Sequence, residues 1–243
     1  MERKPQRLFV ETALAEGADI TCGREQANYL LNVLRLGPGD DVLVFDGHTG
    51  EWRARLKSGR RGACSLEIVA QTRPQELGPD IHYLFAPLKR ARLDYMVQKA
   101  TEMGVAHLAP VITRRTQTAR VNLKRMRANA VEAAEQCGIL WVPDVAEPRQ
   151  LSAVLDQWDE DRQIIYCDEV APIADPLQGL RDLSPGPLAL LIGPEGGFDE
   201  SEREMLQAKP SVTAISLGPR VMRADTAAVA ALALINAALG DWR

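Results

Sequence analysis

The sequence has few of the residues from which metal centres and disulfide frameworks are built. Its 243 residues include four cysteines, which are widely spaced and form no Cys-x-x-Cys pair, and three histidines, which do not cluster with carboxylates. Zinc sites and disulfide-stabilised folds depend on such spacings, so neither is expected and we predict no metal. The pattern is typical of buried free thiols in a reducing cytoplasm.

Long apolar runs and the familiar nucleotide-binding loops are lacking as well. No run approaches membrane-spanning length, and residues 1–5 do not lead into the apolar core of a signal peptide. We therefore expect a cytoplasmic protein without a membrane partner. The chain has no Gly-x-x-x-x-Gly-Lys-Ser/Thr sequence, and no Gly-x-Gly-x-x-Gly follows the first strand expected in its α/β region. These absences argue against the usual nucleoside triphosphate or dinucleotide site.

Two short apolar runs stop abruptly at glycine and proline. They are LLIGPEGG at residues 190–197 and SLGPRVMR at residues 216–223. A helix is expected after each, opened by residues 199–202 in the first case and spanning residues 224–239 in the second. Repeated strand, loop and helix are typical of a parallel sheet, whose ligands bind beyond the carboxyl ends of the strands. We predict that the two loops form a ligand pocket, although each alone is also consistent with a simple tight turn.

The remainder of the chain favours two domains. Short strands with glycine-rich turns over residues 1–73 are typical of a small β-barrel. Residues 74–80 have the polar, proline- and glycine-containing character of a linker, and residues 81–243 alternate strands with helices. We expect strands at residues 7–10, 41–47, 52–56, 64–69, 81–87, 107–112 and 163–167, and helices at residues 23–34, 93–104, 122–137 and 148–158.

Charge is distributed unevenly along the chain. The net charge is −4, yet residues 86–130 contain ten Lys or Arg against two acids, whereas residues 131–243 contain eight basic and nineteen acidic residues. A basic stretch inside an acidic protein favours nucleic-acid binding, although it is also consistent with a solvated face. Residues 57–61 of the expected barrel could grip a phosphate backbone or be solvated barrel edges. The candidate RNA contacts are Arg7, Lys89, Arg114 and Arg115.

The paired loops identify a family resemblance. LIGPEGG at residues 191–197, with LGPRVMR at residues 217–223 and the following Thr226 and Ala227, resembles the signature of the RsmE family of the SPOUT superfamily. QKATEMGV at residues 98–105, AAEQCG at residues 133–138 and RLF at residues 7–9 are similar to further family blocks. The resemblance covers essentially the whole chain, and its two carboxyl-terminal loops are the specific part.

The resemblance implies a fold, a reaction and partners. Members of this family methylate N3 of a specific uridine in 16S ribosomal RNA with S-adenosylmethionine, and the 30S subunit is the expected setting. The implied fold is an N-terminal PUA-like barrel followed by a SPOUT α/β domain with a C-terminal trefoil knot, assembled as a homodimer. The apolar members of the implied cofactor site are also consistent with ordinary core. The implied cofactor-binding residues are Leu191, Gly193, Pro194, Glu195, Gly196, Gly197, Leu217, Gly218, Arg220, Val221, Met222 and Thr226.

The chain departs from the family pattern at two places. Where the family usually has Arg-Thr-Glu-Thr, residues 223–226 read Arg-Ala-Asp-Thr, so Asp225 keeps the carboxylate on a shorter arm and Ala224 loses a hydroxyl. Where the family usually has arginine after the AAEQCG block, this chain has Ile139. Any RNA contact that the family makes through that arginine is therefore in doubt.

Methylation of uridine N3 requires loss of the proton that this nitrogen carries. A carboxylate can accept the proton, typically with a gain of about 100- to 10,000-fold, and a guanidinium can stabilise the uridinate. Arg223 or Arg220 suits the second role, and Glu102, Glu195 or Asp225 the first. Glu195 and Asp225 are also consistent with capping the helices that follow them. The expected catalytic residues are Arg223, Glu102 and Asp225, and the sequence does not name the base.

Other functions and assemblies stay open at this point. An RNA-binding assembly factor without chemistry and a SPOUT methyltransferase of other specificity, such as a tRNA ribose enzyme, are the alternatives. The expected helix at residues 224–239 is apolar almost all round, so it is buried either within one subunit or at an interface. The family resemblance favours the interface.

Overall fold

The computed structural model describes residues 6–59, 62–171, 175–184 and 186–242. The chain divides into two compact units, the first comprising Met1–Leu77 with Ala134–Trp141 and the second comprising Gly78–Ala133 with Val142–Arg243. A linker was predicted at residues 74–80, and residues 134–141 were not predicted to belong to the first unit. That segment joins the first unit through contacts between residues far apart in the chain, which local patterns do not report.

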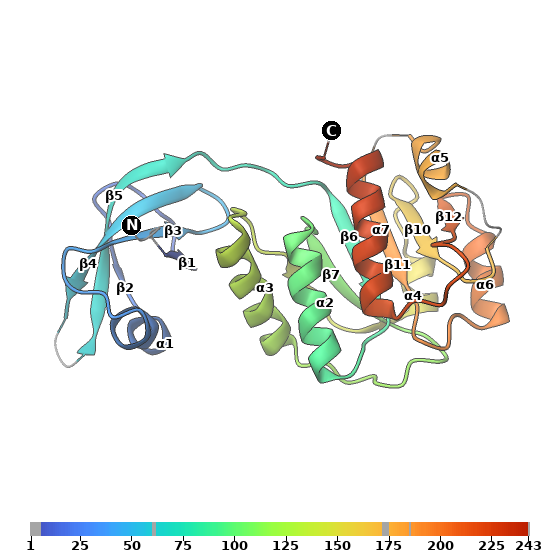
Figure 1. The fold of residues 1–243 in the computed structure, drawn as a ribbon, viewed down its shortest axis with the longest axis horizontal. Helices are drawn as coiled ribbons and strands as arrows, with labels where there is room; N and C mark the ends of the chain where they lie inside the picture. The colour runs from blue at the N-terminus through green and yellow to red at the C-terminus, as the bar shows by residue number, and fades with distance from the viewer. Residues whose placement is uncertain (1–5, 60–61, 172–174, 185, 243) are drawn as a thin grey trace. The chain divides into compact units, whose positions relative to one another are not determined.

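The first unit is built on a five-stranded sheet of order β1-β3-β4-β5-β2 (Figure 1). β1 is parallel to β3, and the other neighbours are antiparallel. Helix α1 and a π-helical turn η1 bury Ala27 and Leu30 among the inward-facing strand residues. The helix predicted over residues 23–34 is therefore two shorter elements, and β2 was not predicted. The bounds are β1 Arg7–Phe9, β2 Asp19–Thr21, α1 Arg24–Asn28, η1 Tyr29–Val33, β3 Asp41–Phe45, β4 Glu51–Ser58 and β5 Cys64–Arg73.

The second unit contains a parallel sheet of order β12-β10-β11-β6-β7-β8, with β9 paired to β7. All five residues of β11 are buried, as expected for a strand covered on both faces of a parallel sheet. Chain order and spatial order differ, because β11 lies between β6 and β10, and β12 lies on the far side of β10. The bounds are β6 Ile81–Phe85, β7 His107–Ile112, β8 Asp144–Val145, β9 Arg149–Gln150, β10 Gln163–Cys167, β11 Leu188–Ile192 and β12 Val212–Ile215.

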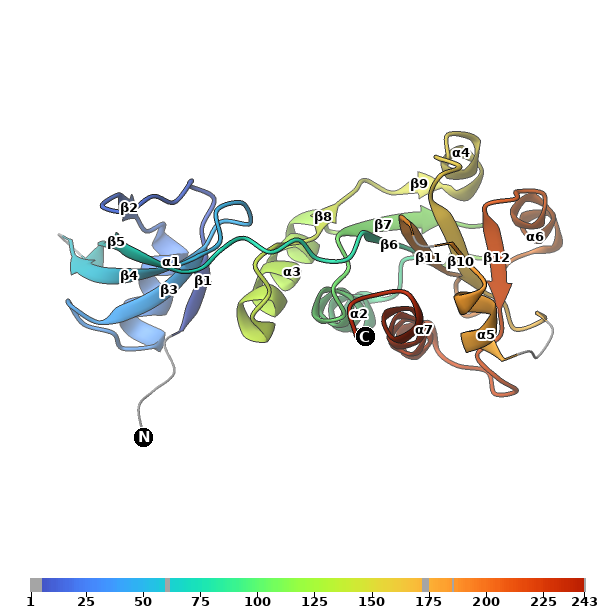
Figure 2. The same cartoon turned by 90° about the horizontal axis from the view of Figure 1, so that it is seen from above.

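Helices cover both faces of this sheet (Figure 2). One apolar cluster unites the sheet with α2, α3, α5 and α7, and another unites the opposite face with α4 and α6. The parallel α/β architecture expected from the sequence is confirmed. Within the described ranges, no helix is both long and apolar enough to cross a bilayer. The bounds are α2 Arg90–Glu102, α3 Leu123–Cys137, α4 Leu151–Asp156, α5 Pro176–Arg181, α6 Glu200–Gln207 and α7 Ala224–Ala238.

Local signals give some helix boundaries correctly and miss others. Asn122 caps α3, because its Oδ1 accepts the backbone N–H of Arg125 at 3.0 Å. The helix predicted over residues 148–158 is wrong in its first three residues: Arg149–Gln150 form strand β9, and Pro148 precedes that strand. Pairing of β9 with β7 outweighs the helical pattern there. β12 ends at Ile215, so Ser216 and Leu217 belong to the following loop.

Candidate active site

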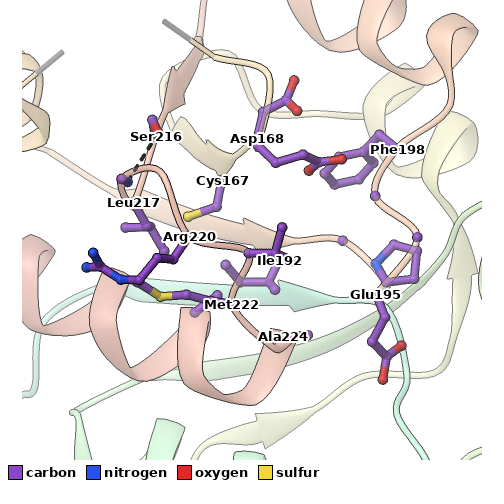
Figure 3. A pocket seen from close by; sticks show the side chains of 18 residues that line it. Cys167, Asp168, Ile192, Glu195, Phe198, Ser216, Leu217, Arg220, Met222 and Ala224 are labelled. Carbon is purple, nitrogen blue, oxygen red and sulfur yellow. Dashed lines mark hydrogen bonds between the residues drawn. The ribbon is translucent and has the colours of Figure 1, made fainter. Parts of the chain in front are cut away.

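Three adjacent strands deliver their following loops to one cavity of about 260 Å³ (Figure 3). β10 pairs with β11 on one side and with β12 on the other, so the three carboxyl ends lie at one edge of the sheet. We call residues 193–199 the β11 loop and residues 216–223 the β12 loop. The lining residues are Cys167, Asp168, Glu169, Ile192, Gly193, Pro194, Glu195, Gly196, Gly197, Phe198, Ser216, Leu217, Gly218, Arg220, Val221, Met222, Ala224 and Ala227.

The β11 loop is fastened to the core by Phe198. This side chain is 1% exposed, and its ring lies edge-on to Tyr166 with 5.9 Å between ring centroids. A Cβ at Gly193 would come within 2.9 Å of the Phe198 ring, so glycine is needed for this close approach. Gly197 has a φ of +68°, in the left-handed region that favours glycine. The loop is thus shaped by glycines around one buried aromatic ring.

Arginines contact the outer side of the same loop. Arg92 Nη1 on α2 donates to Glu195 Oε1 at 2.8 Å, and Arg115 Nη1 donates to the carbonyl oxygen of Gly196 at 2.6 Å. Arg114 Nε lies 3.3 Å from Asp199 Oδ2. The second half of the basic stretch and the start of α2 therefore meet the β11 loop, although they lie about 80 to 100 residues away in the chain.

A capping box ends the β11 loop and begins α6. Asp199 Oδ1 accepts the N–H of Glu202, and Glu202 Oε2 accepts the N–H of Asp199, each at 3.0 Å. Glu202 is buried, and its Oε1 also accepts the backbone N–H of Arg114 at 2.8 Å. The possibility that Glu195 caps this helix is therefore wrong, because Asp199 is the N-cap residue.

The β12 loop is held differently. Gly218 donates its N–H to Ser216 Oγ at 3.2 Å and has a φ of +96°, and a Cβ placed on it would meet no atom within 4 Å. Val221 is 89% exposed, and Arg220 is exposed as well. Met222 and Leu217 provide apolar surface to the cavity (Figure 3).

The end of β10 supplies an ion pair and a neutral thiol. Asp168 is 3% exposed and accepts from Arg203 Nε at 3.1 Å, and Glu169 accepts from Arg203 Nη2 at 3.1 Å. Burial raises the pKa of the Cys167 thiol to about 12, so this cysteine stays protonated at neutral pH. Cys167 therefore serves as a wall of the cavity, since nucleophilic chemistry needs the thiolate.

Most of the predicted cofactor residues line the cavity, and two do not. Leu191 is fully buried in the core on the α4 and α6 face of the sheet, and Thr226 is exposed on α7. The predicted residues found in the lining are Gly193, Pro194, Glu195, Gly196, Gly197, Leu217, Gly218, Arg220, Val221 and Met222.

The three predicted catalytic residues lie outside the lining. Glu102 is at the end of α2 and pairs with Lys99 at 2.8 Å. Arg223 is exposed at the N-cap of α7, and Asp225 in the first turn accepts the N–H of Thr226. The described carboxylates that do line the cavity belong to Asp168, Glu169 and Glu195.

The prediction that Arg7 contacts RNA is wrong, because its side chain is engaged within the first unit. Its side chain is 12% exposed, and its Nε donates to Glu51 Oε2 at 2.8 Å. Its Nη atoms donate to the carbonyl oxygens of Ala134, Glu135 and Ile139. A guanidinium engaged in this way stabilises the first unit and has no open side for a phosphate.

The other predicted RNA contacts are better placed for solvent. Lys89 is exposed immediately before α2, and Arg114 and Arg115 are exposed beside the β11 loop. Within residues 57–61, Lys57 pairs with Asp19 and Glu67, while residues 60–61 lie outside the described part of the chain.

Asp168 and Glu169 line the cavity but were not predicted as site residues. A usable signal existed, because residues 163–167 were correctly predicted as a strand and these acids follow it directly. The rule that ligands bind beyond the carboxyl ends of parallel strands applies equally to this third strand. The prediction covered the loops after β11 and β12, and the loop after β10 lies between them.

A second cavity, of about 310 Å³, lies over β6, β7 and α4. Its His82 and His107 rings lie 4.7 Å apart, and burial lowers the pKa of His82 to about 4, so this imidazole is neutral at pH 7. Arg162 there is engaged with both carboxylate oxygens of Asp80. In the described part of the chain, no cluster of three or more His, Cys, Asp or Glu is arranged to hold a metal.

Comparison with known proteins agrees with this geometry. The RNA methyltransferase domain family matches residues 75–236, and the RNA methyltransferase PUA domain family matches residues 22–69. The N-terminal PUA-like domain expected from the sequence is thereby confirmed, together with the methyltransferase domain that carries the cavity.

Individual relatives match along nearly the whole chain. Ribosomal RNA small subunit methyltransferase E of Synechocystis is 32% identical over 96% of this chain and 78% of its own, and that of Rickettsia conorii is 27% identical over 96% of both. The crystal structure of the Neisseria gonorrhoeae enzyme bound to S-adenosylmethionine is 26% identical, with a TM-score of 0.88 over 98% of this chain and 100% of that one. A Legionella pneumophila methyltransferase with bound cofactor is 27% identical, with a TM-score of 0.87 over the same shares. With a family match over two thirds of its length and relatives that span it, the chain belongs to the RsmE family of ribosomal RNA small subunit methyltransferases.

Proposed function

We propose that this protein uses S-adenosylmethionine to methylate N3 of a specific uridine in 16S ribosomal RNA of the small subunit, in the cytoplasm. The observation that carries the proposal is the three-loop cavity at the carboxyl edge of the parallel sheet. It lies where ligands bind in α/β sheets, in a chain whose relative from Neisseria gonorrhoeae was crystallised with this cofactor.

The cavity fits a cofactor with a flat adenine and a polar tail. Its volume of about 260 Å³ is slightly below the roughly 300–1,000 Å³ typical of small-molecule sites. Gly218 faces open space that a side chain would begin to fill, and Ile192, Leu217 and Met222 offer apolar walls. Glu169 adds a carboxylate on the β10 side. We assign cofactor binding to the lining members of the β11 and β12 loops, which do not include Leu191 or Thr226.

The bound cofactor would supply an electrophilic methyl group, and the protein must prepare the nucleophile. Uridine N3 has to lose its proton, and a guanidinium at the cavity stabilises the resulting anion. Arg220 lies in the lining, whereas Arg223 is outside it, at the N-cap of α7. Three carboxylates were predicted as possible bases. Of these, Glu195 lines the cavity, whereas Glu102 and Asp225 do not. We therefore propose Arg220 or Arg223 for anion stabilisation and Glu195 as the first candidate for the base.

A knotted, dimeric enzyme is part of the same proposal. Val229, Ala230, Ala233 and Leu234 of α7 stay half-buried in the single chain, which leaves an apolar strip for a second copy. Residues of the β11 and β12 loops line the same cavity, and a threaded carboxyl-terminal segment would bring two such loops together. Sedimentation at low micromolar concentration tests the dimer, and a single-chain species that methylates RNA would refute it. Tracing a crystal structure tests the knot.

The decisive experiment is nucleoside analysis of 16S RNA. RNA from cells that lack this protein should have no 3-methyluridine, and incubation with the purified protein and S-adenosylmethionine should restore it. Appearance of a ribose-methylated nucleoside would indicate a methyltransferase of different specificity. Calorimetry with the cofactor alone distinguishes an enzyme from an RNA-binding assembly factor, because a protein of the second kind would bind RNA but not the cofactor.

A further inference from the structure

Three arginine side chains from two segments meet the outer side of the β11 loop. Arg92 comes from α2, and Arg114 and Arg115 follow β7; we call these three residues the arginine rim. Their partners are at neighbouring positions of the loop, namely Glu195, Asp199 and the carbonyl oxygen of Gly196. Because these partners are close in the chain, the three guanidinium groups are gathered at one side of the cavity.

The rim remains accessible to solvent. The side chain of Arg92 is 41% exposed and that of its partner Glu195 is 38% exposed, and Arg114 and Arg115 are exposed as well. Figure 3 shows the Glu195 carboxylate directed away from Asp168 and Phe198, so that Glu195 lines the cavity and still reaches outward to Arg92. The Arg92–Glu195 pair is therefore an exposed bridge between the rim and the cavity wall.

The three guanidinium groups form a potential anion-binding site, in which the protein's own Glu195 carboxylate occupies the position next to Arg92. Guanidinium groups bind phosphate through paired N–H groups, and they do so better than lysine where geometry matters. An exposed ion pair is weak, so an incoming phosphate can displace the carboxylate at small cost. Arg114 is also fixed through its backbone N–H, which Glu202 accepts, so its position does not depend on the pairing of its side chain.

We propose that the arginine rim binds a phosphodiester of the RNA strand at the mouth of the cavity, and that Glu195 occupies Arg92 until this phosphate displaces it. The proposal rests on the function proposed above. It adds that the three arginines bind the phosphate and that the Glu195 carboxylate occupies Arg92 in the free protein. RNA binding thereby frees the Glu195 carboxylate at the moment when the target base arrives. In the free protein Glu195 affects RNA affinity through Arg92, and once released its carboxylate is available for the role of base proposed above.

A double-mutant cycle tests the exchange, with 16S RNA affinity measured by filter binding between 50 and 200 mM salt. Glu195→Gln should bind RNA about two- to fivefold more tightly, since the competing carboxylate is gone. Arg92→Gln should bind more weakly, and its salt dependence should fall by about 0.7–0.9 in log–log slope, as loss of one phosphate contact requires. In the Arg92→Gln background, Glu195→Gln should have no further effect.

Glu204→Gln on α6 is the matched control, because it removes the same charge from an exposed glutamate without a rim partner. If Glu204→Gln gains as much RNA affinity as Glu195→Gln, the gain results from the change in net charge alone, and the proposal is overturned. A gain that persists in the Arg92→Gln background would show direct repulsion between Glu195 and RNA, which also overturns it. Thermal melting confirms that each variant is folded.

Failure of this inference can be distinguished from failure of the proposed function. If the unmodified protein forms 3-methyluridine in 16S RNA and the cycle shows no coupling between Arg92 and Glu195, only the exchange is wrong. If the protein binds neither cofactor nor 16S RNA, the proposed function itself fails.

Discussion

The β11 and β12 loops look alike in sequence but are fastened to the molecule in different ways. Both follow an apolar run and both contain Gly-Pro. The β11 loop has Phe198 in the core, a capping box at its end and arginines on its outer side. The β12 loop closes on itself through Ser216 and leaves Val221 almost fully exposed.

This difference assigns the two walls of the cavity different roles. A wall fixed by a buried ring and by ion pairs is in place before a ligand arrives, which lowers the ordering cost of binding. A wall that presents exposed side chains can form many of its contacts with the ligand or with another macromolecule. We therefore expect similar substitutions in the two loops to change the free energy of unfolding and the cofactor affinity by different amounts.

The largest expected effect is that of Phe198→Ala. Removing a fully buried ring leaves a cavity that typically costs about 3–5 kcal/mol, and we expect a loss of this size in urea unfolding together with weaker cofactor binding. Val221→Ala in the β12 loop should change the free energy of unfolding by less than about 0.5 kcal/mol. A loss below about 1 kcal/mol for Phe198→Ala would remove the basis for calling the β11 loop the fixed wall.

Alanine at the two left-handed glycines sharpens the same contrast. Gly197→Ala and Gly218→Ala each impose an unfavourable backbone conformation, worth about 1–2 kcal/mol in thermal or urea unfolding. At Gly197 the new Cβ would also overlap the Glu169 carboxylate, whereas at Gly218 it meets open space. The Glu169 carboxylate ends a flexible, half-exposed side chain and can move aside at small cost, so the excess loss at Gly197 should stay below about 0.5 kcal/mol, and Glu169→Ala should abolish it. An excess above about 1 kcal/mol at Gly197 would contradict this account.

Ser216→Ala measures the fastening of the β12 loop. It removes the acceptor for the N–H of Gly218, and a neutral hydrogen bond of this kind contributes about 0.5–1.5 kcal/mol. Because Gly218 is close to solvent, we expect the lower end of that range in urea unfolding, with a clearer effect on cofactor affinity. A loss as large as that of Phe198→Ala would show that the β12 loop is fastened as firmly as its neighbour.

The smallest expected effect is a pH dependence at the end of the β11 loop. The backbone N–H of Glu202 holds the pKa of Asp199 below its ordinary value of 3.8. A lowered folded-state pKa means that this contribution is complete above about pH 4 and disappears as the pH falls through the folded-state value. Asp199→Asn should therefore melt below the unmodified protein at pH 7, with the difference shrinking on acidification below pH 3.8. A constant difference from pH 7 to 2.5 would contradict this cause.

Much of the site could be predicted from local sequence. Apolar runs of strand length that stop at glycine and proline predicted two neighbouring loops, and ten of the twelve predicted cofactor residues line the cavity. The same motifs predicted the family, which is confirmed. The position of Leu191 was not predictable in this way, because alternating strand residues face opposite sides of the sheet and the register decides which side faces the ligand.

The contacts that charged residues make with distant parts of the chain could not be predicted from local sequence. Arg7 looked like a surface cation, yet its partners lie about 44 to 132 residues away and bury it. Arg92 and Arg115 reach the β11 loop across 103 and 81 residues. Spacing along the chain carries no information about such pairs.

The class of the sheet, the two glycine–proline loops and the family follow from the residue pattern, because they depend on short-range apolar patterning and on motifs of a few residues. Long-range folding brings Asp168 and Glu169 into the cavity, buries Arg7 and places the arginine rim against the β11 loop. For the cavity, the strand order is responsible. Placing β10 between β11 and β12 brings three loops to one edge, and that order results from long-range pairing that no local segment encodes.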